Sequence, residues 1–187
     1  MGSRTPALMS STDAPNDTSE PRVRIRPSSS HRLNVILVEP EIALNTGSIG
    51  RTCVAAGAML WLVRPLGFHL DDRHLRRAGL DYWEHLTWRA VDSLDEVKEA
   101  LGPERLWSFS TKGTRPYTEA GYLPGDTLIF GPESRGLPNR WLSEQSDHVL
   151  RIPIRPEARS LNLANAVAIA VFEAVRQLDL GDVNAGC

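Results

Sequence analysis

Hydrophobic and polar positions follow two different periods along most of the chain. Runs rich in β-branched and other apolar residues predict strands, and stretches with an apolar residue every three or four positions predict helices. The predicted strands are residues 33–38, 59–63, 105–110, 127–130 and 148–152. The predicted helices are residues 45–56, a charged helix at 72–78, 94–101, a short helix after 138 and a long one at 161–178. This alternation is typical of an α/β domain, in which a parallel sheet is flanked by helices.

The last predicted helix is apolar over an unusually wide face. Its apolar positions fall on one stripe and on the positions adjacent to it, which predicts that most of the helix is buried. Ser160 is a plausible N-cap, with Asn162 in the first turn. Capping does not explain Asn165, because an amide in a buried helix needs hydrogen-bond partners.

The two ends of the chain differ in composition from the part between them. Residues 1–31 are rich in Ser, Thr, Pro and Asp, which predicts a disordered tail; residues 32–180 are the predicted domain, and 181–187 a flexible C-terminus. With 41% hydrophobic and 24% charged residues the chain is neither collagen-like nor disordered throughout. A net charge of −2 predicts that any nucleic-acid site is a local patch.

Export, membrane and metal signals are weak. The N-terminus has no apolar secretory block, and polar residues interrupt the most apolar stretch, 161–178, so no membrane association is expected. Cys53 and Cys187 form no CxxC, which favours a reducing cytoplasm over a disulfide. The five histidines show no i, i+4 spacing, so we expect no metal.

Three segments carry candidate chemistry. The first, 45–53, opens a predicted helix directly after a strand, where free N–H groups suit an anion. It resembles half of a dinucleotide-binding fingerprint, but Asn45 replaces the first glycine, so a nicotinamide site stays a weak alternative. The second, 128–138, places two glycines, two prolines and a Glu–Arg pair after a strand, where open α/β sheets bind ligands. The third is 151–165.

In this order and at these separations, the three segments resemble the motifs of the SPOUT class of RNA methyltransferases. The stretches are EPEIALNTGSIGRTC, LIFGPESRGLP and RIPIRPEARSLNLANAVAIAVFEA, and the likeness spans about residues 33–178. Two more, DDRHLRRAGLDYWEH and STKGT, are similar to the tRNA wobble-nucleotide (cytidine/uridine-34) 2′-O-methyltransferases. The resemblance implies a parallel sheet with a C-terminal deep trefoil knot, a homodimer, S-adenosyl-L-methionine (SAM) as methyl donor and tRNA as substrate.

The resemblance also implies roles for individual residues. The expected SAM-binding residues are Phe109, Ser110, Thr111, Gly131, Glu133, Ile152, Ser160 and Leu161. The expected catalytic residues are Arg51, Asn45, Glu133, Ser160 and Asn162, with Arg51 at the phosphate and 2′-hydroxyl of the nucleotide. A base role for Arg51 is held loosely, because guanidinium is effectively always protonated in proteins.

RNA contacts have a plain alternative at every position. The candidates are Arg73, Arg76, Arg77, Lys112, Arg135, Arg155 and Arg159, with the ring of Tyr82 or Trp83 stacking on an unpaired base. The arginines of 73–77 can equally form a solvated helix face, and the aromatic rings can be core or dimer contacts. Two other functions stay open: the same chemistry at another tRNA or rRNA position, and a non-catalytic RNA-binding assembly factor.

Overall fold

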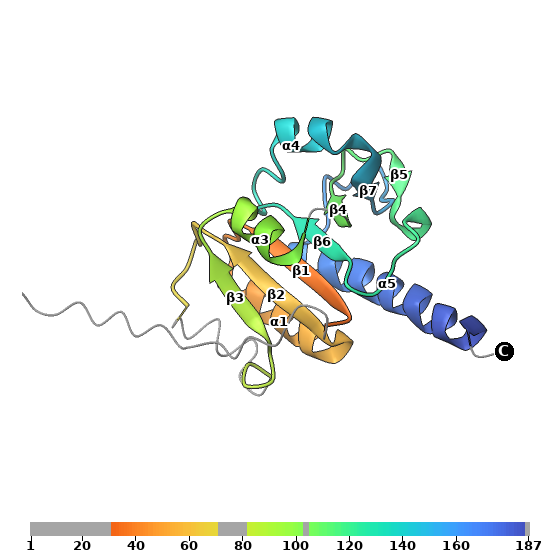
Figure 1. The fold of residues 1–187 in the computed structure, drawn as a ribbon. Coiled ribbons are helices and arrows are strands. Elements are labelled where there is room, and N and C mark those ends of the chain that lie inside the picture. Colours follow the sequence, from red (N-terminus) through yellow and green to blue (C-terminus); the bar gives the residue numbers. More distant parts are fainter. Residues whose placement is uncertain (1–30, 71–81, 103–104, 186–187) are drawn as a thin grey trace, which may run out of the picture.

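Seven parallel strands form a single sheet at the centre of the molecule (Figure 1). The computed structural model describes residues 31–70, 82–102 and 105–185. The strand order is β3-β2-β1-β6-β4-β7-β5, and every neighbouring pair is parallel. The strands are β1 (Leu33–Val38), β2 (Ala58–Val63), β3 (Trp88–Val91), β4 (Leu106–Phe109), β5 (Arg115–Pro116), β6 (Thr127–Phe130) and β7 (Val149–Arg151). The predicted parallel α/β sheet is therefore confirmed.

Helices cover both faces of the sheet, which explains why the central strands β1, β2 and β6 are buried along their whole length. Helices α1 (Ala43–Ala56) and α5 (Leu163–Ala185) pack against each other on one face. Helices α3 (Leu94–Leu101) and α4 (Asn139–Glu144) contribute to the core of the other face. Two short 3-10 turns, Tyr117–Glu119 and Ser146–His148, precede β6 and β7.

The predicted elements differ from the observed ones mainly at their ends. The first helix begins at Ala43, two residues before its predicted start, and the last continues to Ala185. Strands β3 and β5 were not predicted: β3 is only partly buried and β5 has two residues, so neither shows a periodic pattern. The predicted charged helix at 72–78 lies outside the described residues, as does nearly all of the predicted tail.

The start of α5 corrects two expectations. Asn162, not Ser160, caps the helix, because its Oδ1 accepts hydrogen bonds from the backbone N–H of Ala164 (2.9 Å) and Asn165 (3.4 Å). The side chain of Asn165 is exposed, so it needs no buried partner. The buried stripe is also narrower than predicted, since Phe172 is 50% exposed. That stripe consists of Val167, Ala170, Val171, Ala174 and Leu178.

The Cys53 thiol is buried, and the described residues offer neither a membrane span nor a group of metal ligands. Cys53 is fully buried in the core between α1 and the sheet, and this burial raises the pKa of its thiol to about 12. Such a thiol is protonated at neutral pH and is a poor nucleophile. Among the described residues, no helix is both long and apolar enough to cross a membrane, and no three His, Cys, Asp or Glu side chains group as metal ligands.

Candidate functional site

A pocket of about 520 Å³ lies at the carboxyl edge of the sheet. Its walls come from the segments that follow β1, β4, β6 and β7, and from the beginnings of α1 and α5. The carboxyl ends of neighbouring parallel strands meet at one edge, so residues far apart in sequence converge there. The volume falls within the roughly 300–1,000 Å³ range of small-ligand pockets.

The apolar part of the pocket is built on two stacked rings. Phe109 at the end of β4 and Phe130 at the end of β6 lie with ring centroids 4.7 Å apart and planes at 15°. Ile152 and Leu161, from the segment between β7 and α5, also line the pocket. These side chains can enclose a flat, largely apolar group such as a purine.

The loop after β6 approaches itself too closely for a side chain at its first position. A Cβ added to Gly131 would lie 2.3 Å from the amide nitrogen of Leu137. Gly136 has a φ of +66° and donates its N–H to Pro132 O (2.9 Å), which closes the turn. The loop therefore leaves backbone groups of Gly131 and Gly136 at the pocket surface, where a ligand can approach them.

A chain of hydrogen bonds joins the three segments singled out in the sequence. Asn45 Nδ2 donates to Glu133 Oε1 (2.9 Å), and Asn162 Nδ2 donates to Asn45 Oδ1 (3.0 Å). Glu133 also accepts the backbone N–H of Glu41 (2.8 Å) and of Ile42 (3.3 Å). Each carboxylate oxygen of Glu133 thus has a protein donor, so the side chain orients the start of α1.

The position of Asn45 is not that of a helix cap. Helix α1 begins at Ala43 with Ile42 as the N-cap residue, and Asn45 lies inside the first turn, 7% exposed. Its amide uses both ends, as donor to Glu133 and acceptor from Asn162. A buried amide satisfied on both sides fixes the distance between α1, α5 and the loop after β6.

The structure brings together most of the expected site residues. All eight expected SAM-binding residues line the pocket. Of the expected catalytic residues, Asn45, Glu133, Ser160 and Asn162 line it as well, but Arg51 does not. Arg51 is exposed farther along α1, where its guanidinium lies over the ring of Tyr82, 4.5 Å from the centroid.

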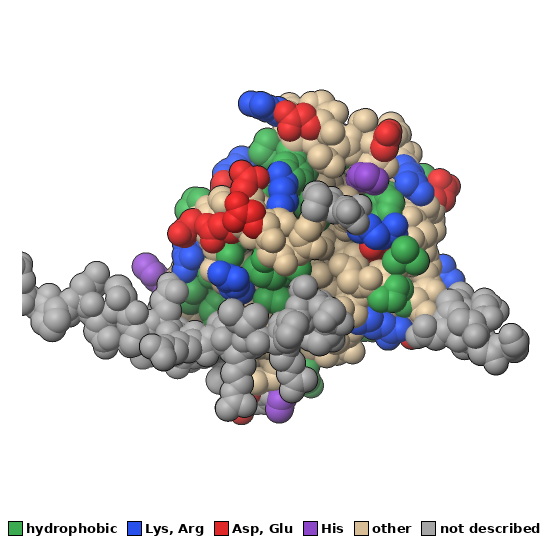
Figure 2. Space-filling model, in the orientation of Figure 1, with side chains coloured by type: hydrophobic (Ala, Val, Ile, Leu, Met, Phe, Trp, Pro, Cys, Tyr) green, Lys and Arg blue, Asp and Glu red, His purple; other side chains and the backbone are tan. Residues whose placement is uncertain are grey.

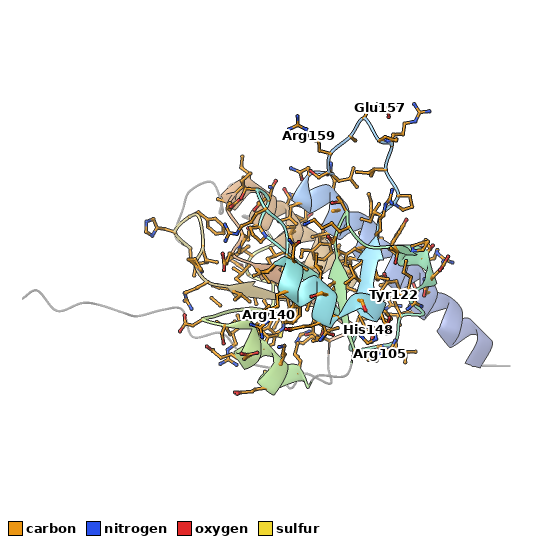
Figure 3. All side chains as sticks on the ribbon, turned by 90° about the horizontal axis from the view of Figure 1, so that it is seen from above. Arg105, Tyr122, Arg140, His148, Glu157 and Arg159 are labelled. Carbon is orange, nitrogen blue, oxygen red and sulfur yellow. The ribbon has the colours of Figure 1, made fainter. Side chains whose placement is uncertain are left out.

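The expected RNA contacts are divided among several environments. Lys112, Arg135 and Arg159 line the pocket, and exposed Arg155 lies on the loop between β7 and α5. Figure 3 shows Arg159 with Glu157 on the outer part of this protruding loop. Lys112 Nζ donates to Asn139 Oδ1 (2.6 Å). Arg73, Arg76 and Arg77 lie outside the described residues.

The two candidate stacking rings have different surroundings. Tyr82 is 39% exposed, whereas Trp83 is half-buried against Trp88, with ring centroids 5.6 Å apart. A Cβ added to Gly50 would lie 3.0 Å from the Trp83 ring, so Trp83 packs closely on α1. The plain interpretation, a packing role, fits Trp83, and Tyr82 is the ring that stays accessible.

Charge is mixed on the face of the molecule that Figure 2 shows. Figure 2 shows acidic side chains gathered over α3, which carries Asp95, Glu96 and Glu99, and basic side chains scattered among other types. Among the described residues of this face, basic side chains form no continuous stripe. The expectation, from a net charge of −2, that any nucleic-acid site is local stays a prediction.

One set of contacts beside the pocket was missed in the sequence. Glu41, which does not line the pocket, accepts hydrogen bonds from Ser134 through the hydroxyl (2.6 Å) and the backbone N–H (2.8 Å). The Ser134 hydroxyl has the largest effect and holds the pKa of Glu41 below its usual value. Desolvation by burial comes next and opposes it, and the Ser134 N–H and the charge of Arg135 lower this pKa further. Arg135 is ion-paired with Glu39 and lies 3.6 Å from Glu41.

The sequence and fold are similar to those of known RNA-modifying proteins. The SpoU rRNA Methylase family matches residues 32–172. A tRNA (cytidine(34)-2′-O)-methyltransferase of Saccharophagus degradans is 51% identical over 149 residues, which cover 78% of this chain and 95% of that protein.

Solved structures give the same picture at the level of the fold. One that concerns the 2′-OH methylation of C/U34 on tRNA is 47% identical with a TM-score of 0.75, covering 79% of this chain and 97% of that one. The SpoU methyltransferase AviRb from Streptomyces viridochromogenes, in complex with the cofactor AdoMet, is 29% identical with a TM-score of 0.70. That match covers 83% of this chain and 60% of AviRb.

Proposed function

The chain belongs to the SpoU rRNA methylase family, and on this premise we propose that it is a SAM-dependent tRNA (cytidine/uridine-34) 2′-O-methyltransferase. It transfers a methyl group from SAM to the ribose 2′-hydroxyl of the wobble nucleotide. The observation that carries the proposal is the convergence of the three sequence segments on one pocket, joined through Glu133, Asn45 and Asn162.

The residues of the pocket fit the methyl donor. Phe109, Ile152 and Leu161 offer apolar walls for an adenine ring, and Gly131 brings backbone groups to the surface without a side chain in the way. Exposed hydroxyls of Thr111 and Ser160 stand at the same pocket. When bound, SAM supplies a methyl group on a positively charged sulfur. We propose that these residues hold and orient it.

Methyl transfer requires mainly that the protein align the ribose 2′-oxygen with the methyl group and stabilise the charges that change during the reaction. We propose that Asn45, Asn162 and Glu133 fix the relative positions of α1, α5 and the loop after β6, and that Ser160 shapes the same wall. Arg51 engages the phosphate and the ribose hydroxyl of the nucleotide through its guanidinium N–H groups, which suit both acceptors.

A tRNA target is favoured over the rRNA of the family's description. The relatives of known target match nearly their whole length, and their target is nucleotide 34 of tRNA. An unpaired base in an anticodon loop suits recognition by stacking and by contacts with its edges, and Tyr82 offers an accessible ring. Lys112, Arg135 and Arg159 at the pocket are the proposed phosphate contacts. We expect the protein to act in the cytoplasm, with its tRNA.

We further propose that the chain is a homodimer and that its C-terminal part forms the trefoil knot of the SPOUT class. Two observations support these proposals. Strand β7 lies between β4 and β5, so the chain returns into the sheet before it reaches α5. The neighbouring helices α1 and α5 also expose apolar side chains of the kind that subunit interfaces cover. These are Leu44, Ile169 and Phe172.

The deciding experiment locates the product. The protein is incubated with SAM and tRNA lacking modifications, and ribose methylation is mapped by mass spectrometry of nuclease fragments. We expect one new methyl group, on the ribose of nucleotide 34.

Each other outcome has a distinct meaning. Methyl groups only at other tRNA positions would contradict the wobble assignment and keep the chemistry. Binding of SAM without methylation of tRNA or rRNA would contradict the enzyme and favour an RNA-binding assembly factor. A parallel reaction with ribosomal RNA separates the two kinds of target.

A further inference from the structure

The loop after β1 and the loop after β6 are joined by two hydrogen bonds, in each of which a carboxylate of one loop accepts a backbone N–H of the other. The Glu133 side chain accepts the backbone N–H of Glu41 at 2.8 Å, and the Glu41 side chain accepts the backbone N–H of Ser134, also at 2.8 Å. Each loop therefore offers an acidic side chain to the backbone of the other. We call this arrangement, formed by residues 41–42 and 133–134, the reciprocal clasp.

We propose that Glu41 is a positioning residue for methyl-donor binding, acting through Ser134 to hold the loop after β6 in the shape that forms the pocket. This inference rests on the proposed function. Glu41 does not line the pocket, whereas Glu133, Ser134 and Arg135 all do. A change at the Glu41 side chain consequently reaches a ligand only by moving that loop.

The backbone at Glu41 is packed closely against the loop after β2, so this side of the reciprocal clasp is the better fixed of the two. A Cβ added to Gly67 would lie 2.5 Å from the Glu41 carbonyl oxygen, and Gly67 N–H donates to Pro40 O (2.9 Å). The loop after β2 thus packs directly under the loop after β1. Because one side is fixed, loss of the Glu41 side chain frees mainly the Ser134 side.

The clasp is separable into two halves by mutation. Replacing the Glu41 side chain leaves its backbone N–H, so the bond to Glu133 and the Asn45 contact are retained. Arg135 also keeps its ion pair with Glu39. What is lost is the pair of bonds from Ser134, of which the hydroxyl bond spans 2.6 Å and the backbone bond 2.8 Å, together with the 3.6 Å contact to the Arg135 guanidinium.

The test compares binding with turnover. Titration calorimetry with S-adenosylhomocysteine measures Kd, and tRNA methylation at varied SAM gives KM and kcat. For Glu41→Ala we expect the Kd for S-adenosylhomocysteine and the KM for SAM to rise about tenfold, because charge-assisted hydrogen bonds that hold the loop are lost. We expect kcat at saturating SAM to stay within about threefold, since no group near the reacting atoms is removed.

Further variants separate positioning from plain stability. Glu41→Gln should recover most of the affinity, because the amide oxygen can accept the Ser134 N–H and the amide nitrogen can donate to the Ser134 hydroxyl. Ser134→Ala should weaken binding less than Glu41→Ala, and the double variant should be no weaker than Glu41→Ala. Glu144→Ala is the matched control, because this exposed carboxylate pairs with Arg140, four residues earlier on α4, and does not line the pocket.

The outcomes that overturn the inference are distinct from those that overturn the function. An unchanged Kd in Glu41→Ala, with or without a lower melting temperature, makes Glu41 a structural residue only. A fall in kcat at unchanged Kd contradicts the role as well. If Glu41→Ala does not fold, an unchanged Kd in Ser134→Ala decides against the inference. A wild-type protein that binds neither SAM nor S-adenosylhomocysteine removes the proposed function, and the inference with it.

Discussion

Arg51 differs from the other candidate catalytic residues in its surroundings. Asn45, Glu133 and Asn162 are committed to one another, whereas Arg51 is exposed and contacts the face of Tyr82 at 4.5 Å. A guanidinium that lies over an aromatic face is held loosely, and the N–H groups at its edge can still donate to an anionic partner. Its position therefore suits a contact to the nucleotide better than one to the methyl donor.

Replacing Arg51 should separate catalysis from cofactor binding. We expect Arg51→Ala to lower kcat for tRNA methylation by about 100-fold or more, because the substitution removes a hydrogen-bond donor that stabilises developing charge. The Kd for S-adenosylhomocysteine should change less than about twofold, because Arg51 does not line the pocket of its own chain. Methylation kinetics and calorimetry measure the two values.

The matched control for this prediction is another exposed arginine. Arg140→Ala removes a side chain that is paired with Glu144 on α4 and does not line the pocket. It should leave both values unchanged. A full loss of S-adenosylhomocysteine binding in Arg51→Ala would refute the assigned role.

Residue identity in the sequence indicated the chemistry but not the geometry. Ser160 and Asn162 are both good capping residues, and nothing local decides between them. In the structure Asn162 is the capping residue, and its side chain also donates a hydrogen bond to Asn45, 117 residues away. Glu41 and Ser134 are 93 residues apart, so their contact has no local signal at all. The pocket residues were predictable through the family motifs, and the contacts among them were not.

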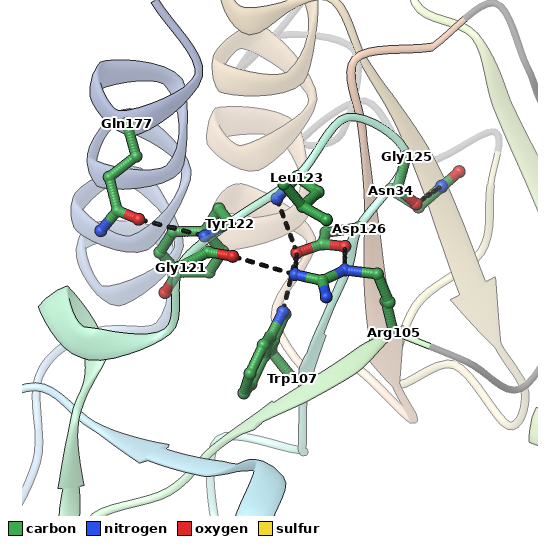
Figure 4. A network of polar contacts seen from close by, with 9 residues as sticks. All are labelled: Asn34, Arg105, Trp107, Gly121, Tyr122, Leu123, Gly125, Asp126 and Gln177. Carbon is green, nitrogen blue, oxygen red and sulfur yellow. Dashed lines mark hydrogen bonds and ion pairs between the residues drawn. The ribbon is translucent and has the colours of Figure 1, made fainter. Parts of the chain in front are cut away.

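At the scale of elements, the start of β4 and the entry to β6 are joined by a buried carboxylate. Figure 4 shows Asp126, which is fully buried, accepting from the side chains of Arg105 and Trp107 and from the N–H of Leu123. Arg105 also donates to Gly121 O (2.9 Å), and its pairing with Asp126 raises the pKa of Arg105. A buried charge is tolerable only with such complete pairing.

Asp126→Asn should therefore be costly. An asparagine amide nitrogen cannot accept, so at least one of the donors to Asp126 loses its partner, and Arg105 loses its counter-charge. We expect a fall of about 2–3 kcal/mol in the free energy of unfolding, kept moderate because the Arg105 side chain is 38% exposed and can be solvated. Urea unfolding at one fixed protein concentration gives the value.

An exposed aspartate provides the comparison for Asp126. Asp95, on α3, is 82% exposed and pairs with Lys98, so Asp95→Asn should change stability by less than about 0.5 kcal/mol. Equal effects of the two substitutions would show that the Asp126 contacts add nothing beyond an ordinary surface pair.

Elements were predicted well where packing imposes a period and poorly where it does not. Strands β1 and β6 are buried from end to end, and their apolar runs gave the observed bounds. Strand β3 is mostly half-buried and carries Trp88 and Arg89, so no alternation marks it. Strand β5 consists of Arg115 and Pro116 and exists only through pairing with β7. Short strands made by their neighbours cannot be read from their own residues.

At the scale of the whole molecule, one face of α5 is unusually apolar for a surface. Phe172 is 50% exposed and Ile169 37%, although the helix carries a complete buried stripe on its other side. The sequence predicted this apolar width as burial within the chain. A second copy of the chain covering α5 would account for the same residues, which is why the wide face supports the proposed homodimer.

A charge placed on that face tests the dimer. We expect the wild-type protein to show about twice its 20.7 kDa chain mass in size-exclusion chromatography with light scattering, and Phe172→Asp to shift toward the single-chain mass, because burying an unpaired carboxylate is unfavourable. Leu123→Asp is the control: Leu123 is equally exposed, at 51%, but belongs to the loop before β6 and not to α5. Dissociation by both variants, or a wild-type protein of single-chain mass at micromolar concentration, would contradict an interface through α5.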